Sequence, residues 1–298
     1  MLEIIDLRKE YNTITALDGI SFKADKGTIF GLLGPNGAGK TTAIRIILDI
    51  LKPTSGEVRF DGHPIDSEFI NRTGYLPEER GLYKKSKVID IIRYLAELKN
   101  IPSGKATELG TEWLKKLDIS SYKDRKLEEL SKGNQQKIQF ITAILHDPGI
   151  LILDEPFSGF DPINQQLIKD LILTFVDSGK TVILSTHQME MAEKLCNEIF
   201  LIDKGKEVVS GNINEVRKRY GKNMVRVEYS GEISFVNSFP YVLSVNAYSN
   251  YAEIELKEEI RPNQFLHDLI EKVEIRSFNV VEASLNKIFI DLIKKASE

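Results

Sequence analysis

The chain has 298 residues, which is long enough for one large domain with a buried core and a second, small domain. Its 40 basic and 44 acidic side chains give a formal charge of −4, a balance that argues against a protein binding nucleic acid chiefly by neutralising phosphates. The single cysteine, Cys196, excludes an internal disulfide, suits a reducing cytoplasm and lies in a helical pattern that predicts a buried position.

Membrane-spanning segments are not expected from this sequence. The first residues, MLEIIDLRKEY, carry charges where a signal peptide has an apolar stretch. Uninterrupted apolar runs stay well short of the roughly 18 residues that a spanning helix needs. We therefore expect a chain that does not cross a membrane by itself, although it can sit against one.

The first 65 residues are rich in predicted strands. Apolar and β-branched runs separated by Gly-containing turns predict strands at 2–7, 20–25 and 28–33, and a strand followed by a turn within 57–65. The third of these runs, TIFGLL, leads directly into GPNGAGKTT and then into the helical pattern AIRIILDILK at 43–52. A Gly-rich loop between a strand and a helix is the setting in which proteins bind phosphate.

The segment GPNGAGKT, residues 34–41, fits the P-loop pattern G-x-x-x-x-G-K-[ST] completely. Its glycines allow the backbone to curl so that successive N–H groups point at phosphate oxygens, and the helix that follows presents its positive end to the same anion. Lys40 is predicted to reach the β- and γ-phosphates, and the Thr41 hydroxyl to bind Mg²⁺. The expected nucleotide contacts at the loop are Asn36, Gly37, Ala38, Gly39, Lys40, Thr41 and Thr42.

Residues from about 86 to 128 have amphipathic helical spacing, most clearly in IDIIRYLAELK and ATELGTEWLKKL. The octapeptide LSKGNQQK follows at residues 130–137. Its residues alone allow two interpretations: the polar start of a helix, or a phosphate-contacting tip that acts only when another chain supplies the nucleotide.

Strands and helices then alternate through GILILDEP, INQQLIKDLILTF, TVILST, QMEMAEKLC and EIFLID, which predicts a parallel sheet covered by helices on both faces. Asp154 and Glu155 end one of these strands, at the edge where open α/β sheets place their ligands. We expect Asp154 to hold Mg²⁺ through water and Glu155 to act as general base on the attacking water. His187 ends the next strand and is predicted to contact the γ-phosphate. The histidines at positions 63, 146 and 267 have no such placement.

The sequence changes character beyond residue 212. A polar, helical connection is expected at 212–221, and a small α/β domain at 222–298, with strands at 224–231, 241–249 and 251–257 and helices at 264–273 and 284–295. Its charges are mixed and balanced. This composition favours a regulatory or partner-contacting role over nucleic-acid binding.

Five motifs in order, GPNGAGKT, LSKGNQQK, ILILDEP, SGFD and STH, resemble the ATPase cassette of the ABC superfamily over residues 1 to about 210. The resemblance implies an α/β P-loop NTPase fold over residues 1–211, with a mixed-sheet core, an antiparallel β subdomain and a helical subdomain at about 86–135. It also favours the second interpretation of LSKGNQQK. In that family the matching segment closes over ATP held by the partner subunit, so the working unit is a dimer.

Further site residues carry over from the resemblance. Ser131 and Gly133 match the family's signature positions, whereas Lys132 replaces a glycine and Asn134 a glutamine. Tyr11 lies where the family stacks an aromatic ring on adenine, and Asp161 lies along the expected dimer interface. Glu78 stands where the family has a glutamine near Mg²⁺ and water, and its carboxylate can also bind a hard cation.

A cassette followed by a small domain that ends in VEASLNKIFIDLI resembles the ATP-binding subunits of bacterial multidrug- and sodium-efflux-type exporters. The resemblance implies an ATPase that uses ATP and Mg²⁺, lies peripherally on the cytoplasmic face of the cell membrane, and works with a separate integral membrane permease and a second ATPase subunit, identical or paralogous. Two alternatives stay open: a soluble ABC ATPase acting on ribosomes or nucleic acid, and a cassette that binds nucleotide without turnover. The single cassette, single cysteine and lack of sustained heptads count against the first.

Overall fold

The computed structural model describes residues 1–79, 81–220, 223–281 and 284–297. The chain divides into two compact units, Met1–Gly211 and Asn212–Glu298. The predicted boundary at 221 and 222, and two residues of the VEASLNKIFIDLI ending, lie outside the described residues. Each unit is described by itself below.

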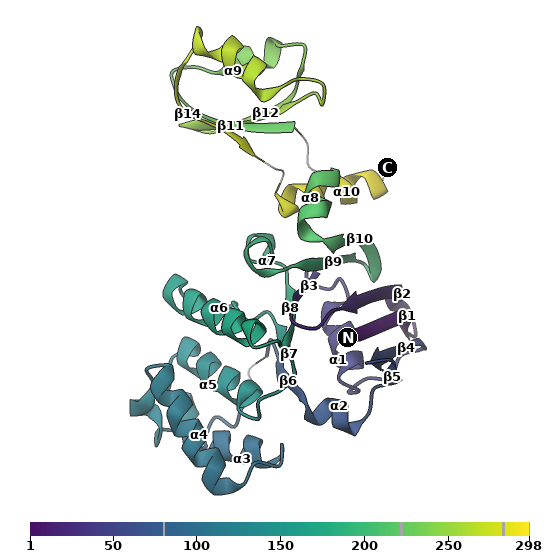
Figure 1. Cartoon of the computed structure of the whole chain (residues 1–298), viewed down its shortest axis with the longest axis vertical. Coiled ribbons are helices and arrows are strands. Elements are labelled where there is room, and N and C mark those ends of the chain that lie inside the picture. Colours follow the sequence, from purple (N-terminus) through teal and green to yellow (C-terminus); the bar gives the residue numbers. More distant parts are fainter. Residues whose placement is uncertain (80, 221–222, 282–283, 298) are drawn as a thin grey trace. The chain divides into compact units, whose positions relative to one another are not determined.

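The first unit begins with an antiparallel sheet in the order β2-β1-β4-β5 (Figure 1). The two long strands bury one face of the sheet, and Leu2, Ile4 and Leu7 of β1 are buried in the core, with a register shift between Ile4 and Leu7. The strands are β1 (Leu2–Tyr11), β2 (Ile14–Ala24), β4 (Ser55–Phe60) and β5 (His63–Pro64).

A six-stranded sheet in the order β10-β9-β3-β8-β7-β6 forms the centre of this unit. Strand β3 pairs in parallel with both β8 and β9, and β7 pairs in parallel with β6 and β8. Three strands, β3, β7 and β8, are buried along their whole length, as their continuous apolar runs predict. The bounds are β3 (Ile29–Leu33), β6 (Thr73–Leu76), β7 (Ile150–Asp154), β8 (Thr181–Thr186), β9 (Glu198–Asp203) and β10 (Lys206–Asn212).

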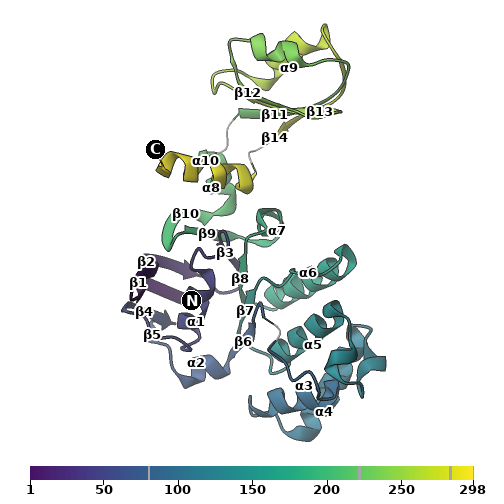
Figure 2. The same ribbon diagram turned by 180° about the vertical axis from the view of Figure 1, so that it is seen from behind.

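Helices cover both faces of this sheet (Figures 1 and 2). Helix α1 (Lys40–Ile47) packs between the antiparallel sheet and one face of the parallel strands, in one core with Phe22, Phe30 and Phe200. Helices α5 (Lys132–Ile144), α6 (Pro162–Asp177) and α7 (Met189–Leu195) lie on the other face. The carboxyl ends of β3, β7 and β8 therefore meet at one edge, where Leu33, Asp154 and Thr186 end their strands.

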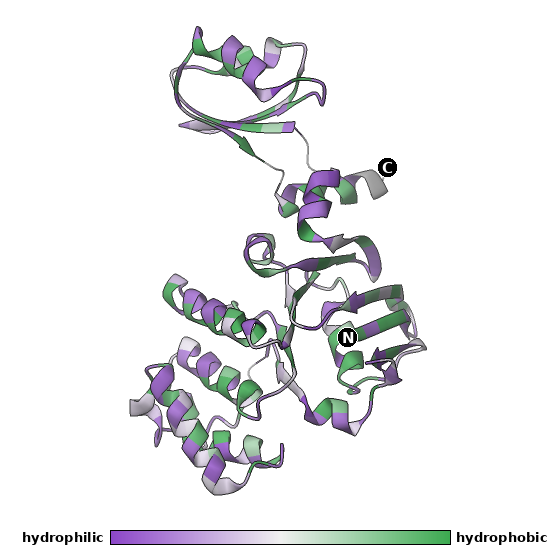
Figure 3. Ribbon diagram, in the orientation of Figure 1, coloured by the Kyte–Doolittle hydropathy of each residue, from purple (hydrophilic) through white to green (hydrophobic). Residues whose placement is uncertain are grey.

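A smaller helical subdomain has its own core. Helices α3 (Val88–Glu97) and α4 (Ser103–Lys116) pack against α5, and both alternate hydrophobic and hydrophilic residues along their length (Figure 3). At Gly110 a β-carbon would lie 2.8 Å from Ile92 Cγ2, so glycine lets the two helices approach closely. Short elements complete this part: α2 (Ser67–Asn71), η1 (Ser120–Tyr122) and η2 (Leu127–Glu129).

The second unit is an antiparallel sheet in the order β12-β13-β11-β14. Helix α9 (Pro262–Ile270) covers one face, where Phe265 and Leu269 are fully buried. Helices α8 (Ile213–Tyr220) and α10 (Leu285–Ser297) pack against each other. The other bounds are β11 (Asn223–Ser230), η3 (Ser234–Ser238), β12 (Val242–Ala247), β13 (Tyr251–Leu256) and β14 (Glu274–Val281).

In the part of the chain that the structure describes, the helices are too short or too polar to span a membrane.

Candidate nucleotide-binding site

The loop between β3 and α1 depends on glycine at two places. Gly34 has φ 156°, and a β-carbon there would lie 2.1 Å from the carbonyl oxygen of Ile202. Gly39 has φ 111°, and a β-carbon there would lie 2.6 Å from the carbonyl oxygen of Ala16. Both positions combine a backbone conformation that side chains disfavour with a neighbouring main chain, so glycine is required for this loop to close tightly over α1.

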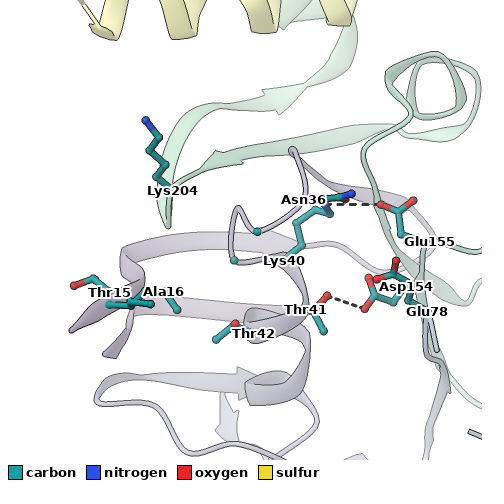
Figure 4. A pocket seen from close by; sticks show the side chains of 13 residues that line it. Thr15, Ala16, Asn36, Lys40, Thr41, Thr42, Glu78, Asp154, Glu155 and Lys204 are labelled. Atoms are coloured by element: carbon teal, nitrogen blue, oxygen red, sulfur yellow. Dashed lines mark hydrogen bonds and ion pairs between the residues drawn. The ribbon is translucent and has the colours of Figure 1, made fainter. Parts of the chain in front are cut away.

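Lys40 is a buried cation at the start of α1. Its Nζ donates to the carbonyl oxygens of Gly34 (2.7 Å) and Pro35 (3.1 Å) and lies 3.8 Å from Glu155 Oε1 (Figure 4). Burial lowers the pKa of Lys40, and the negative charges of Glu155, Asp154 and Glu78 oppose that shift. The ammonium group is thus held beside the loop that curls around it and opposite the carboxylates.

Asp154 ends the buried strand β7 and faces Thr41. The Thr41 hydroxyl donates to Asp154 Oδ2 at 3.1 Å, whereas Asp154 Oδ1 is buried with no hydrogen-bond partner among the described residues. Burial raises the pKa of Asp154, and the nearby hydroxyls of Ser185 and Thr41 oppose that shift. A buried carboxylate oxygen without a hydrogen-bond partner lowers the stability of the fold unless a cation or water binds it.

These residues fit Mg²⁺. Thr41, Asp154 and Glu78 offer hard oxygen donors to the same pocket, with Glu78 beside Asp154 in Figure 4. Mg²⁺ is usually held by one or two carboxylates, water and substrate phosphates rather than by a cage of protein ligands, and these donors fit that pattern.

Glu155, in a left-handed conformation (φ 49°), is held by the end of β8. Its Oε1 accepts from His187 N at 2.9 Å and lies 2.7 Å from His187 Nδ1, while its Oε2 accepts from Thr186 Oγ1 at 3.0 Å. The carboxylate is 4% exposed, but the His187 side chain is 46% exposed. The acid is therefore enclosed by protein, whereas the imidazole that contacts it is half-exposed.

One pocket of about 510 Å³ joins these groups. Besides P-loop residues and the three carboxylates, it is lined by Ile14, Thr15, Ala16 and Lys204, which were not predicted. Figure 4 places Thr15, Ala16 and Lys204 apart from the carboxylates. These four residues carry no motif; they come to the loop because the start of β2 and the turn after β9 pack against it, with Gly205 N donating to the Ala38 carbonyl at 2.9 Å.

Comparison with known proteins decides the family. The family model of ABC transporters matches residues 17–158, and a model described as the C-terminal domain of DrrA1-3-like ATP-binding proteins matches residues 211–293. An uncharacterized ABC transporter ATP-binding protein of Bacillus subtilis, YhaQ, is 42% identical over 98% of both chains. The chain belongs to the ABC transporter ATP-binding proteins. The predicted recognition is confirmed.

Two further comparisons extend this result. The Nod factor export ATP-binding protein I of Cupriavidus metallidurans is 33% identical over 78% of both chains. A solved ATP-binding subunit of an ABC transporter superposes with a TM-score of 0.68 at 26% identity, covering 74% of this chain and 93% of that one. The fold class expected for an ABC cassette is thereby confirmed.

The signature residues of this ABC subunit lie outside the pocket formed by its own P-loop. Ser131 caps helix α5, its hydroxyl accepting from Asn134 N at 3.3 Å, and Gly133 follows in the first turn. Asp161 caps α6, where hydrogen bonds from Asn164 lower the pKa of its carboxyl. The composite site that the sequence predicts, and the roles of these residues in it, therefore stay predictions.

Tyr11, Ala38 and His187 are the other predicted contacts that do not line the pocket. Tyr11 ends β1 on the same hairpin as Thr15 and Ala16, is 46% exposed, and has Lys9 Nζ 5.2 Å from its ring centre. Ala38 is buried. An exposed ring at this place is available to stack on a base, so the adenine role of Tyr11 stays a prediction.

Two buried glutamines of α5 were also missed. Gln136 Nε2 donates to the Pro156 carbonyl at 2.9 Å, and Gln139 Nε2 lies 3.2 Å from the carbonyl oxygens of Pro77 and Glu79. They join the helix that begins with the signature to the loops carrying Glu155 and Glu78. A polar residue on the inner face of an amphipathic helix was the signal available in the sequence.

Proposed function

We propose that this subunit hydrolyses ATP with Mg²⁺ and so powers export by a separate membrane permease. The observation that carries the proposal is the convergence of Lys40, the Thr41–Asp154 pair and Glu155 on one P-loop pocket, with His187 in contact with Glu155. Phosphoryl transfer of this kind depends on positioning and charge stabilisation, which such a constellation supplies.

Each residue has a distinct task in this proposal. Backbone N–H groups from Asn36 to Gly39 and the start of α1 bind the phosphates, Lys40 contacts the β- and γ-phosphates, and Thr42 adds a contact to the α-phosphate. Thr41 and Asp154, with Glu78 beside them, hold Mg²⁺, which when bound neutralises charge on the phosphate oxygens.

Hydrolysis itself is assigned to Glu155 and His187. Glu155 takes the proton of the water that attacks the γ-phosphorus, and the bond from that phosphorus to the β,γ-bridging oxygen breaks, leaving ADP and phosphate. His187 turns to the γ-phosphate and helps to hold the water. Its 2.7 Å contact with Glu155 and its exposed ring support a side chain that can serve both groups.

The partners follow from what one chain lacks. The signature residues Ser131, Gly133 and Asn134 lie outside their own pocket, which supports a dimer in which each signature closes over the other subunit's ATP. The relative whose name includes Nod factor export and the DrrA-like C-terminal match support an exporter. The subunit would then lie on the inner face of the membrane, docked on its permease.

The test uses Glu155→Gln in the full chain. We expect ATP turnover to fall at least 100-fold while ATP binding persists, because the amide cannot accept the proton. Pulled from detergent-solubilised native membranes with ATP and Mg²⁺, this variant should bring a polytopic membrane protein with it.

Lys40→Ala is the matched control, since loss of the phosphate-binding cation should abolish both ATP retention and ATP-dependent recovery of the membrane protein. Normal turnover by Glu155→Gln would remove Glu155 as the base. Recovery of ribosomes or nucleic acid instead of a membrane protein would support a soluble ABC ATPase and end the exporter proposal.

A further inference from the structure

The two carboxylate oxygens of Glu155 are held by different groups. Oε1 receives the His187 backbone N–H and faces both the His187 ring and Lys40, 2.7 and 3.8 Å away. Oε2 receives the Thr186 hydroxyl at 3.0 Å, the only side-chain hydrogen bond recorded for it within the described residues. One oxygen is thus turned toward the pocket side of the site and the other is anchored at the end of β8.

The Thr186 hydroxyl has a fixed direction. It accepts a hydrogen bond from Gln188 N at 3.0 Å, so its own hydrogen is directed to Glu155 Oε2. The side chain is fully buried, and the backbone carbonyl of Thr186 accepts from Gly34 N, the first residue of the P-loop, at 3.4 Å. A buried donor with both ends engaged resists reorientation.

His187 holds Glu155 less permanently. Its ring is 46% exposed, and in the proposed reaction it turns to the γ-phosphate, which frees one position on Oε1 for the attacking water. A carboxylate released by the ring would rotate unless something else held it, and proton transfer needs the base within hydrogen-bond reach of the water. Thr186 and the His187 backbone N–H are the groups placed to keep it there.

We propose that Thr186 is a positioning residue: its hydroxyl anchors Glu155 Oε2 so that Oε1 stays turned to the attacking water when the His187 ring leaves. This inference rests on the proposed function. It concerns the orientation of the base rather than nucleotide binding, so it predicts an effect on kcat and none on ATP affinity.

Thr186→Val and Thr186→Ser test it in the full chain. Valine has nearly the same shape but cannot donate, so kcat for ATP hydrolysis should fall roughly 10- to 100-fold, while the dissociation constant for ATP stays within about twofold. Serine keeps the hydroxyl and should restore kcat to within about threefold of the unmutated chain.

Thr181→Val is the matched control. Thr181 is the buried threonine at the other end of β8, where its hydroxyl donates to the Asp25 carbonyl at 3.2 Å, remote from the P-loop pocket. This variant also replaces a buried threonine of β8 by valine, and its kcat should stay unchanged. If Thr186→Val does not fold, Thr186→Ala replaces it with the same expected direction and a smaller loss, since water can enter the space.

The outcomes separate this inference from the proposed function. Thr186→Val should cause no further loss when added to Glu155→Gln, because the base it positions is already gone. If Glu155→Gln is inactive and Thr186→Val turns over normally, or if Thr181→Val loses as much activity as Thr186→Val, Thr186 has no positioning role. If Glu155→Gln hydrolyses ATP normally, the proposed function itself fails.

Discussion

Glu78 gives the pocket a third carboxylate beside Asp154 and Glu155, at a position where the sequence resemblance predicts an uncharged glutamine. Its charge acts on Lys40 and on Tyr75, whose pKa rises to about 12 through burial and the nearby charges of Asp154 and Glu78. We therefore predict that Glu78→Gln weakens divalent-cation binding about tenfold, because a hard cation loses an anionic ligand or close counter-charge. Mn²⁺ titration followed by electron paramagnetic resonance, with a non-hydrolysable ATP analogue present, measures this directly.

Glu79→Gln is the control for Glu78. Glu79 is the next residue of the same loop, is also exposed, and does not line the pocket. The same loss of one negative charge there should leave Mn²⁺ affinity within about twofold of the unmutated chain, since an exposed charge at a distance is screened by solvent. Equal weakening by both variants would mean that Glu78 acts only through net charge and is not a metal ligand.

At the scale of elements, strand β6 is tied to the end of α5 by His146. Its Nε2 lies 3.2 Å from the Thr73 carbonyl, and burial, assisted by the positive charge of Lys99, lowers the pKa of His146 to about 4. The folded pKa is below the unfolded value, so the neutral ring stabilises the fold above about pH 6.5 and that stability is lost as the pH falls toward 4. When the pH falls over that interval, we predict that the His146→Gln chain loses less unfolding free energy than the unmutated chain, by on the order of 2 kcal/mol.

Urea unfolding at pH 7 and at pH 4.5 measures this difference. Carboxylates also titrate there, so the comparison is between variants and not with zero. His63→Gln, which replaces an exposed histidine of β5, is the control and should lose as much unfolding free energy as the unmutated chain. The assignment is wrong if His146→Gln shows the same loss as His63→Gln.

The sequence predicted the elements whose pattern is strong and missed those whose pattern is mixed. The buried strands β3, β7 and β8 are continuous apolar runs, and α3 and α4 have clear amphipathic spacing, so both kinds were placed correctly. Strand β14 was missed because EIRSFNVV has charged residues on one half and exposes Val280, which leaves no clean alternation. Its place is set by pairing with β11, a contact that sequence periodicity does not contain.

The candidate site was predictable to the same extent. Residues that carry chemistry lie in motifs whose spacing fixes their place, Lys40 at the start of the helix after the P-loop and Glu155 just past the end of a buried strand. Thr15, Ala16 and Lys204 line the pocket only because separate segments of chain pack against the P-loop. Thr186 was visible in STH as a neighbour of His187, but its bond to Glu155 Oε2 depends on the pairing of β7 with β8.

At the scale of the whole molecule, the proposed dimer explains why the signature helix exposes its first turn. Ser131 and Lys132 are exposed, and they belong neither to the lining of their own P-loop pocket nor to the core of the helical subdomain. We predict that Ser131→Arg abolishes ATP-dependent dimerisation and lowers ATP turnover at least 50-fold, because the bulky cation occupies the place where the partner's γ-phosphate would dock. Light scattering of the Glu155→Gln chain with and without Ser131→Arg, in ATP and Mg²⁺, measures the dimer.

The control must separate this steric block from damage to helix α5, because Ser131 also caps that helix and loss of the cap costs about 1 kcal/mol. Ser103→Arg places the same side chain at the exposed start of α4 in the same subdomain and should dimerise normally. Binding of ATP to the monomer should survive in Ser131→Arg, since Ser131 does not line the P-loop pocket of its own chain. A Ser131→Arg chain that dimerises and hydrolyses ATP like the Ser103→Arg chain would show that this site is not shared between subunits. Loss of dimerisation with monomer ATP binding intact would mean that each subunit carries half of two sites, so hydrolysis in one is tied to the presence of the other.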